Sequence, residues 1–288
     1  MSENSIPVTQ LKITQLTIYP VKSMKGIALE SALLTSSGLN HDRRFMVVQS
    51  NGRFVTQRDN SRLALIQTEL DADGLLLARP GFGSITIPMD QTGGSPISSK
   101  VWKDRCETVD RGEEVSQWLT GTLESEEPLR LVSMDPGFKR SLSKAVFLGT
   151  DTSTYFADAA PYLVANESSL QKLNTELVAD GADAVPMNRF RPNIVVSGLK
   201  PFAEHNVIQV TGPDLALGFC YPCERCVVTT INQDTGQRDS RKQPFRTLAR
   251  INPMPENPRA PAFAENAVLK SGEGQVIRVG DLLRAEFG

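Results

Sequence analysis

Hydrophobic and polar residues alternate over short stretches in the first third of the chain, which is the pattern of β-strands with one buried face. The stretch LKITQLTIYPV at residues 11–21 alternates in this way, and LDADGLLLARPGFGSITIP at residues 70–88 predicts two further strands. In RFMVVQSNGRFVTQRD, residues 44–59, Asn51-Gly52 stands between two apolar runs and predicts a hairpin turn. Closely spaced short strands of this kind favour a small barrel or sandwich.

Helical periodicity is confined to a few segments. Residues 112–123 place apolar side chains on one helical face, and residues 166–180 carry leucines in helical register behind a polar start at Asn166. Residues 243–251 predict a short helix with Pro244 near its first turn. The chain is therefore expected to contain few helices.

The second half mixes strands with irregular segments. Residues 191–198 and 226–232 are predicted to be buried strands, and residues 274–287 a closing strand pair. Residues 252–266 are rich in proline and are predicted to form a surface loop, while residues 134–154 are interpreted as a loop and a soft domain boundary. Strands with few helices predict a β-rich α+β fold rather than alternating βαβ units.

Composition narrows the class of protein. The chain has 288 residues, of which 40% are hydrophobic and 22% charged, so it is expected to be globular. Its net charge of −2 gives no indication of a nucleic acid partner, and no apolar run approaches the roughly 20 residues that span a bilayer. The first ten residues lack the pattern of a signal peptide, and four cysteines without an export signal favour a reducing, cytoplasmic location.

Three of the four cysteines stand in the pattern C-x2-C-x2-C, at Cys220, Cys223 and Cys226. This spacing resembles the start of an iron–sulfur ligand run, but the fourth cysteine, Cys106, lies far upstream. A zinc site would have to recruit one of only two histidines. A Cys223–Cys226 redox pair is a further alternative, although such pairs precede a helix and a β-branched run follows Cys226.

Cys226 differs from the other two cysteines in its neighbours. Arg225 precedes it, and a nearby guanidinium favours the thiolate form. The predicted strand that follows would hold the side chain in place. A lone thiolate of this kind is a suitable ligand for a soft, high-valent metal.

Basic residues gather beside predicted turns and strand ends. They are Lys22, Lys25, Arg43, Arg44, Arg58, Arg189 and Arg191, with Ser23, Asn188 and Asn193 next to them. If NRFRPN is extended, Arg189 and Arg191 share one side of the chain and Phe190 faces the other. Two guanidiniums on one face offer bidentate donors to phosphate or carboxylate. No glycine-rich phosphate loop is present, so an anion site would be built from side chains.

Together these segments resemble a known family. YPVKSMKGIAL, GLNHDRRFMVV and TQRDNSRLALI are similar to the N-terminal β-barrel domain that precedes MOSC domains. NRFRPNIVVSG and CERCVVTTINQDTG are similar to the MOSC domain itself, in the subgroup of the mitochondrial amidoxime-reducing component and its bacterial counterparts. The resemblance implies an N-terminal β-barrel domain over residues 8–125 and a MOSC β-barrel domain over residues 126–288.

The resemblance also implies a molybdenum cofactor (molybdopterin). By motif position, Cys226 would be the metal ligand, and Asp158 would be a catalytic proton donor or an orienting residue. The expected cofactor-binding residues are Lys22, Ser23, Arg43, Arg189, Arg191 and Asn193. Ala159 and Ala160 depart from the hydroxyl residues expected in some relatives.

Members of this family reduce N-hydroxylated small molecules such as amidoximes and hydroxylamines, so the resemblance implies the same activity here. Electrons would come from a separate protein of the ferredoxin, flavodoxin or cytochrome type, because no cysteines remain for a [2Fe–2S] domain. The alternatives are a non-enzymatic cofactor carrier or sulfur-transfer module, and a structural zinc or iron–sulfur module. The resemblance further brings an association with pyridoxal phosphate binding.

Overall fold

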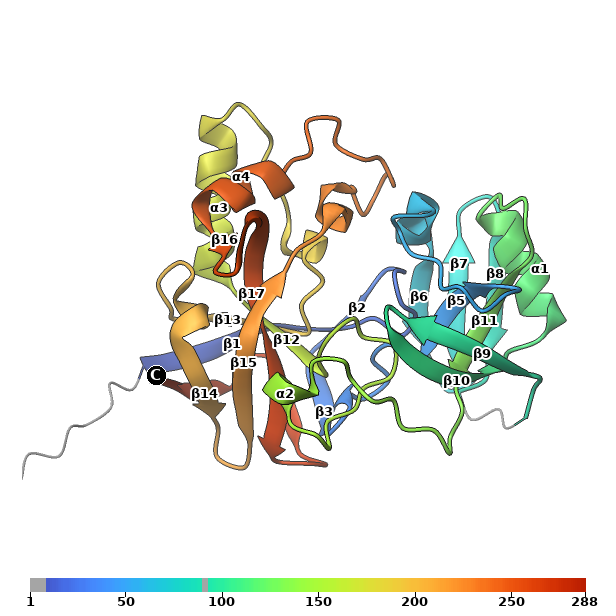
Figure 1. Cartoon of the computed structure of the whole chain (residues 1–288), viewed down its shortest axis with the longest axis horizontal. Helices are drawn as coiled ribbons and strands as arrows, with labels where there is room; N and C mark the ends of the chain where they lie inside the picture. Colours follow the sequence, from blue (N-terminus) through green and yellow to red (C-terminus); the bar gives the residue numbers. More distant parts are fainter. Residues whose placement is uncertain (1–8, 90–92) are drawn as a thin grey trace, which may run out of the picture.

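A closed barrel of strands from both ends of the chain organises the fold (Figure 1). The structure is a computed structural model that describes residues 9–89 and 93–288. The barrel strands, in spatial order, are β12 (Tyr162–Asn166), β13 (Ile194–Ser197), β1 (Thr9–Ile18), β19 (Leu282–Phe287), β14 (Val207–Thr211), β15 (Ala216–Glu224) and β17 (Asn257–Ser271). Pairing of β12 with β17 closes the ring. The short strands β2 (Ile27–Leu29) and β16 (Pro253–Met254) extend it from β1 and β17.

The N-terminal strand β1 lies within this barrel rather than with the segments that follow it. It pairs with β13 on one side and with β19 on the other. The alternation predicted for residues 11–21 places Leu11 and Ile13 in the barrel core, where neither side chain is exposed. The chain therefore begins in the barrel, leaves it, and returns.

A second lobe is built from most of the residues between β2 and the barrel strand β12 (Figure 1). One sheet has the order β5 (Phe45–Gln49), β11 (Leu129–Met134), β10 (Asp104–Asp110) and β9 (Pro96–Val101). A second contains β6 (Gln67–Leu70), β7 (Leu75–Arg79) and β8 (Gly83–Ile87). A separate sheet of β18 (Val276–Arg278), β3 (Ser31–Thr35) and β4 (Gly38–Leu39) packs on the barrel core instead of belonging to this lobe. The helix α1 (Glu113–Thr122) buries Val115 and Leu119 against this lobe.

The remaining helices support the barrel and its loops. They are α2 (Ala145–Leu148), α3 (Glu167–Ala179) and α4 (Phe245–Ile251), with single 3-10 turns η1 (Ser61–Leu65), η2 (Met187–Arg189), η3 (Ala203–Asn206) and η4 (Val227–Thr230). Asn166 caps α3 by accepting a hydrogen bond from the Ser168 amide, as its sequence predicts. The ring of Phe190, which follows η2, stacks on Phe263 at 3.9 Å beneath α3 and α4. The expected β-rich fold with few helices is confirmed.

Two sequence predictions about strands were wrong for identifiable reasons. Residues 226–232 form the turn η4 instead of a strand, because the Thr229 and Thr230 hydroxyls donate to carbonyls three residues earlier. Residues 252–266 are not a surface loop, since β17 runs through Asn257–Ser271 and is paired on both sides. Its prolines lie toward its outer end, where fewer ladder hydrogen bonds are required.

Two further predictions were correct only in part. Residues 274–287 contain two strands, but β18 pairs with β3 and β19 with β1 and β14. The turn at Asn51-Gly52 is present, with Gly52 at φ 80°, yet its second arm makes only a bridge at Phe54. The strand β5 pairs mainly with β11, a partner 80 residues away that no local pattern indicates.

The segment at residues 134–154 is mostly irregular, but it contains the largest fully buried side chain of the described residues, Arg140. Its guanidinium donates to Asp104 at 2.7 and 3.0 Å and to the carbonyls of Tyr155 and Ala157 at 2.9 and 2.6 Å. Asp104 also accepts from the Ser143 amide. Arg140 therefore fixes the end of the β9–β10 hairpin against residues 155–158.

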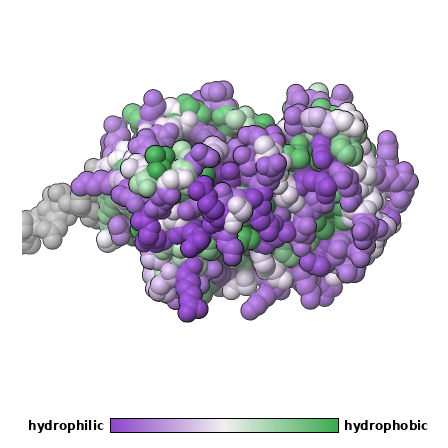
Figure 2. Space-filling model, turned by 90° about the horizontal axis from the view of Figure 1, so that it is seen from above, coloured by the Kyte–Doolittle hydropathy of each residue, from purple (hydrophilic) through white to green (hydrophobic). Residues whose placement is uncertain are grey.

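The surface has a different character from these interiors. The face seen in Figure 2 is mostly hydrophilic, and its hydrophobic residues lie in small separate groups. None of the helices in the described ranges is both long enough and apolar enough to cross a bilayer.

We predict that Arg140→Met destabilises the protein by about 3–5 kcal/mol, because it leaves the Asp104 carboxylate buried without its partner. Chemical denaturation monitored by circular dichroism would measure the change. The control is Arg250→Met, since Arg250 is 52% exposed and pairs with Glu176 and Asp180 on the surface. The free energy of unfolding of that variant should fall by about 1 kcal/mol or less. Equal losses in the two variants would contradict the role given to Arg140.

Candidate functional site

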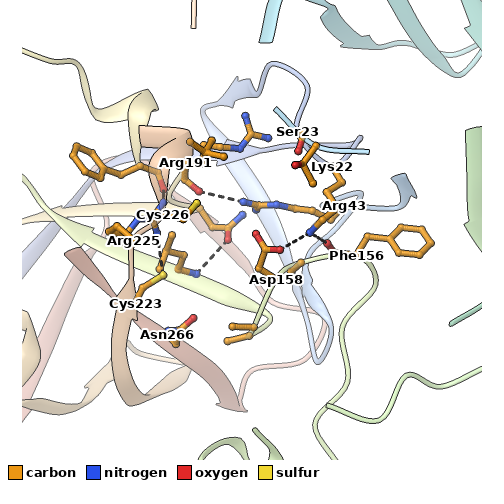
Figure 3. Close-up of a pocket in the computed structure, with 18 of the residues that line it drawn as sticks. Lys22, Ser23, Arg43, Phe156, Asp158, Arg191, Cys223, Arg225, Cys226 and Asn266 are labelled. Atoms are coloured by element: carbon orange, nitrogen blue, oxygen red, sulfur yellow. Dashed lines mark hydrogen bonds and ion pairs between the residues drawn. The ribbon is translucent and has the colours of Figure 1, made fainter. Parts of the chain in front are cut away.

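A cleft lies between the barrel and the second lobe, lined mainly by loops together with Leu163 of β12, Cys223 of β15 and Asn266 of β17. Its lining contains Lys22, Ser23, Arg43, Thr56, Arg58, Phe156, Ala157, Asp158, Ala159, Ala160, Leu163, Phe190, Arg191, Asn193, Cys223, Arg225, Cys226, Val228 and Asn266. Figure 3 shows Arg191, Arg225 and the two cysteines on one side and Lys22, Arg43 and Asp158 facing them. Most of the residues named from the sequence therefore meet in one place.

Cys226 stands at the start of η4, where its thiol accepts a hydrogen bond from the Arg58 guanidinium at 2.9 Å. The sequence had indicated Arg225 as the neighbour of this thiol, and that prediction was wrong. Arg58 comes from the second lobe, 168 residues earlier in the chain. The contact places a cation of the second lobe directly on this sulfur.

Arg225 is directed instead toward the second thiol of the cleft. Its guanidinium donates to Cys223 Sγ at 2.9 Å and to the Phe190 carbonyl at 2.7 Å. Burial raises the pKa of the Cys223 thiol, and Arg225 offsets part of that rise. Cys220 does not line the cleft and packs near α2. In the part of the chain that the structure describes, no three Cys, His, Asp or Glu side chains are grouped to hold a metal ion.

Arg43 and Arg191 lie on the ring of Tyr19, with their guanidinium carbons 4.3 and 4.1 Å from its centre. Arg43 is also paired with the buried carboxylate of Asp42 at 2.6 Å. Burial lowers the pKa of Arg191 to about 10, and its Nη2 is buried without a hydrogen-bond partner. An unpaired buried donor facing a cleft is suited to an anionic ligand.

The backbone around the cleft is strained. Ser23, Arg43 and Arg191 have φ values of 71°, 46° and 55°, in the left-handed region that residues other than glycine seldom adopt. Each such residue costs on the order of 1–3 kcal/mol and persists where surrounding contacts enforce it. Three of them around one cleft indicate that it is a functional site rather than an ordinary surface groove.

Lys22 and Asp158 form an ion pair at one end of the cleft, 2.7 Å apart. The lysine is buried and also donates to the Phe156 carbonyl, while the Asp158 side chain is 59% exposed. Burial lowers the pKa of Lys22, and the Asp158 carboxylate opposes that effect. For Asp158, desolvation acts to raise the pKa, but the Lys22 ammonium and the Trp102 indole outweigh it and hold the pKa below its usual range.

Two residues expected to bind a cofactor have structural contacts. Arg189 does not line the cleft, because it ends the 3-10 turn η2 instead of lying in an extended strand, and its guanidinium donates to the Thr229 carbonyl at 3.1 Å. Asn193 reaches the cleft, but its amide donates to the Thr17 carbonyl and accepts from the Leu163 amide. Arg189 therefore supports η4, and Asn193 joins three barrel strands.

The sequence reasoning missed contacts that cross between the two lobes. The buried amides of Gln57 and Gln233 are hydrogen-bonded at 3.0 Å, and Gln57 also donates to the Ser23 carbonyl at 2.7 Å. These contacts hold the segment with Arg58 against the segment that follows η4. No motif or spacing relates residues that lie 176 positions apart.

The cleft carries more positive than negative charge. It contains Lys22, Arg43, Arg58, Arg191 and Arg225 with one carboxylate, Asp158. Lys22 and Arg43 are paired with Asp158 and Asp42, and the other three arginines have no carboxylate partner among the described residues. Unpaired guanidiniums beside a thiol fit a ligand that combines an anionic group with a thiophilic metal.

We predict that Asp158→Asn destabilises the protein at pH 7 by about 1 kcal/mol or less, because solvent screens a pair with one exposed partner. The folded-state pKa of Asp158 lies below its unfolded value of about 3.9. The contribution is therefore present above about pH 4 and is lost as the pH falls below it. Denaturation midpoints of the two proteins, measured between pH 6 and pH 3, should converge at the acid end. Asp234→Asn, in the exposed pair with Lys25, should show no such trend.

Comparison with known proteins identifies the family to which this chain belongs. The MOSC N-terminal beta barrel domain matches residues 10–126, and the MOSC domain matches residues 151–284. The chain is 34% identical to mitochondrial amidoxime-reducing component 1 of Mus musculus over 282 residues, covering 93% of this chain and 80% of that protein. The corresponding protein of Homo sapiens is 33% identical over 285 residues, covering 93% and 81%. Component 2 of Bos taurus is 32% identical over 243 residues, covering 82% and 70%. The chain therefore belongs to the MOSC family, among the relatives of the mitochondrial amidoxime-reducing components.

Proposed function

We propose that this protein is a molybdenum cofactor-dependent reductase of N-hydroxylated compounds of the amidoxime or hydroxylamine type. The observation that carries the proposal is that Cys226, whose thiol accepts from Arg58, lines the same cleft as arginines without a carboxylate partner. Similarity to proteins named amidoxime-reducing components supports the choice of reaction.

The residues present fit the two ends of such a cofactor. Cys226 would ligate the metal, and Arg58 would stabilise the ligand sulfur through its hydrogen bond. Arg191, with its unpartnered buried Nη2, would bind the anionic pterin phosphate, next to Arg43 and Ser23. Arg189 and Asn193 would act indirectly, by holding the segments that carry these groups.

The reaction requires electrons from outside the cleft. Removing the oxygen of an N-hydroxyl group consumes two electrons and two protons and releases water. When bound, the molybdenum cofactor would supply this two-electron oxygen-removal chemistry. We propose that a separate redox protein, of the ferredoxin, flavodoxin or cytochrome type, delivers the electrons.

Asp158 is assigned an orienting role in this proposal. Its carboxylate is held as an anion by Lys22 and accepts a hydrogen bond from Trp102 at 2.8 Å. A carboxyl whose pKa lies below its usual range carries no proton to donate near neutral pH. Asp158 therefore suits the orientation of Lys22 or of a substrate amino group better than proton transfer.

A non-enzymatic cofactor carrier or sulfur-transfer module is the second candidate. In that role Cys226 would hold the cofactor or carry a sulfane sulfur. The second thiol that lines the cleft, Cys223, is the observation that favours it, since thiol exchange passes from one thiol to another. Turnover separates the two functions, because a carrier would bind cofactor without reducing substrate.

We predict that protein produced in a host that makes the cofactor contains close to one molybdenum per chain. Cys226→Ala should reduce the molybdenum and pterin content by about tenfold or more, because the metal loses its protein ligand. Cys223→Ala is the matched control, since Cys223 is the other cleft thiol that accepts from an arginine, and it should keep most of the metal. Elemental and pterin analysis would measure both.

Reduction of an aromatic amidoxime with a reduced viologen dye as electron source would then test turnover. The loaded wild-type protein should consume the substrate and Cys226→Ala should not. Molybdenum binding without turnover would favour the carrier. Wild-type protein without molybdenum, or equal losses in both cysteine variants, would contradict the proposal.

A further inference from the structure

Trp102 occupies a position where the backbone disfavours a large side chain. It is the first residue of the two-residue connection between β9 and β10, in which Val101 pairs with Asp104. Its φ is 56°, and such connections normally carry glycine, asparagine or aspartate. Its indole is 48% exposed, so burial in a core does not account for its presence. Contacts specific to the indole must favour tryptophan here.

Those contacts are made with two residues that line the cleft. The indole Nε1 donates to Asp158 Oδ1 at 2.8 Å. The Arg58 guanidinium lies over the ring, 4.6 Å from its centre, and the Phe54 and Trp102 rings pack in a T-shaped arrangement with their centres 5.4 Å apart. A guanidinium over an indole face is the most favourable cation–π pair in proteins. Trp102 thus contacts both Asp158 and Arg58.

Each of these two residues contacts a group at the centre of the site. Arg58 donates to Cys226 Sγ at 2.9 Å, and Asp158 is paired with Lys22 at 2.7 Å. One indole therefore joins the thiol end of the cleft to the ammonium end. A long arginine side chain without such a support would sample many rotamers and leave the sulfur for much of the time.

The β9–β10 hairpin that carries Trp102 is itself held in place. Asp104, two residues after Trp102, is held by the buried guanidinium of Arg140, which also binds the carbonyls of Tyr155 and Ala157. The hairpin and the segment that carries Asp158 are therefore fixed relative to each other. This clamp determines that the indole reaches Asp158 rather than solvent.

We propose that Trp102 is a positioning residue of the cleft, which keeps the Arg58 guanidinium on the Cys226 thiol and the Asp158 carboxylate on Lys22. The significance of the Cys226 contact rests on the proposed function, in which this sulfur ligates the metal. A hydrogen bond to a ligand sulfur alters the reduction potential of the metal. Trp102 would therefore act on the site through Arg58, without touching the cofactor or the substrate.

Three variants separate the contributions of the indole. Trp102→Phe keeps an aromatic face for Arg58 but removes the donor to Asp158, and Trp102→Leu removes both. Trp118→Leu is the matched control, because the Trp118 indole donates to the Phe82 carbonyl on the second lobe and does not line the cleft. Arg58→Ala removes the group through which Trp102 is proposed to act.

The first measurement is the rate of alkylation of Cys226 by iodoacetamide in the 288-residue chain, followed by peptide mass spectrometry. At pH 10, above the ordinary pKa of a cysteine thiol of about 8.5, the rate reports access to the sulfur. Trp102→Leu should raise the alkylation rate of Cys226 by about 3–10-fold, and Arg58→Ala should raise it similarly. The double variant Trp102→Leu/Arg58→Ala should be no faster than Arg58→Ala alone. The alkylation rate of Trp102→Phe should stay within about twofold of the wild-type rate, and that of Trp118→Leu should equal the wild-type rate.

Cys106 provides an internal control for local unfolding, since it is buried in β10 of the same hairpin. Its alkylation should remain slow in every variant. If Cys106 and Cys226 become reactive together in Trp102→Leu, or if Cys226 is unaffected, the positioning role is wrong. In the loaded enzyme, Trp102→Leu should lower kcat with little change in KM, and Trp102→Phe should restore most of it. The alkylation result is independent of cofactor, so it remains decisive even if the proposed function fails.

Discussion

The arrangement of the cleft depends on the burial of one guanidinium, that of Arg140. A charged group removed from water is tolerated only when its hydrogen bonds are made in full, and Arg140 makes them to Asp104 and to carbonyls of residues 155–158. The irregular segment around it is consequently held in one conformation. Through that segment the second lobe is positioned against the loop that carries Asp158.

The barrel supplies the other fixed reference. Because β1 is inserted between β13 and β19, the loop that follows it, with Lys22 and Ser23, emerges at the end of the barrel where η2 and η4 also lie. Side chains from sequence positions far apart therefore converge, and most of them are carried by loops at the strand ends. Loops on a rigid scaffold are a common location for binding groups, and the left-handed conformations of Ser23, Arg43 and Arg191 show how firmly these loops are held.

Local pattern predicted those elements whose own residues carry a clear periodicity, cap or turn signal. The helices α1, α3 and α4 and the strands β1, β7 and β8 follow from periodicity, a capping Asn166, and turn residues. Prediction failed where tertiary contacts outweighed propensity. The β-branched run after Cys226 forms a turn because the Thr229 hydroxyl donates to the Cys226 carbonyl and Arg189 donates to the Thr229 carbonyl. The proline-rich residues 253–261 form a hairpin of β16 with the start of β17, whose later residues are flanked by β15 and β12.

The sequence alone determined the chemical inventory of the site: a distinct cysteine, a set of arginines and lysines, and the motifs that resemble MOSC proteins. Only the tertiary structure decided which charge meets which sulfur. Adjacency along the chain paired Cys226 with Arg225, whereas folding pairs it with Arg58 and directs Arg225 to Cys223. The physical reason is that hydrogen bonds and cation–π contacts depend on distances in space. Those distances are set here by barrel closure, which pairs strands more than a hundred residues apart in sequence, and by the Arg140 clamp.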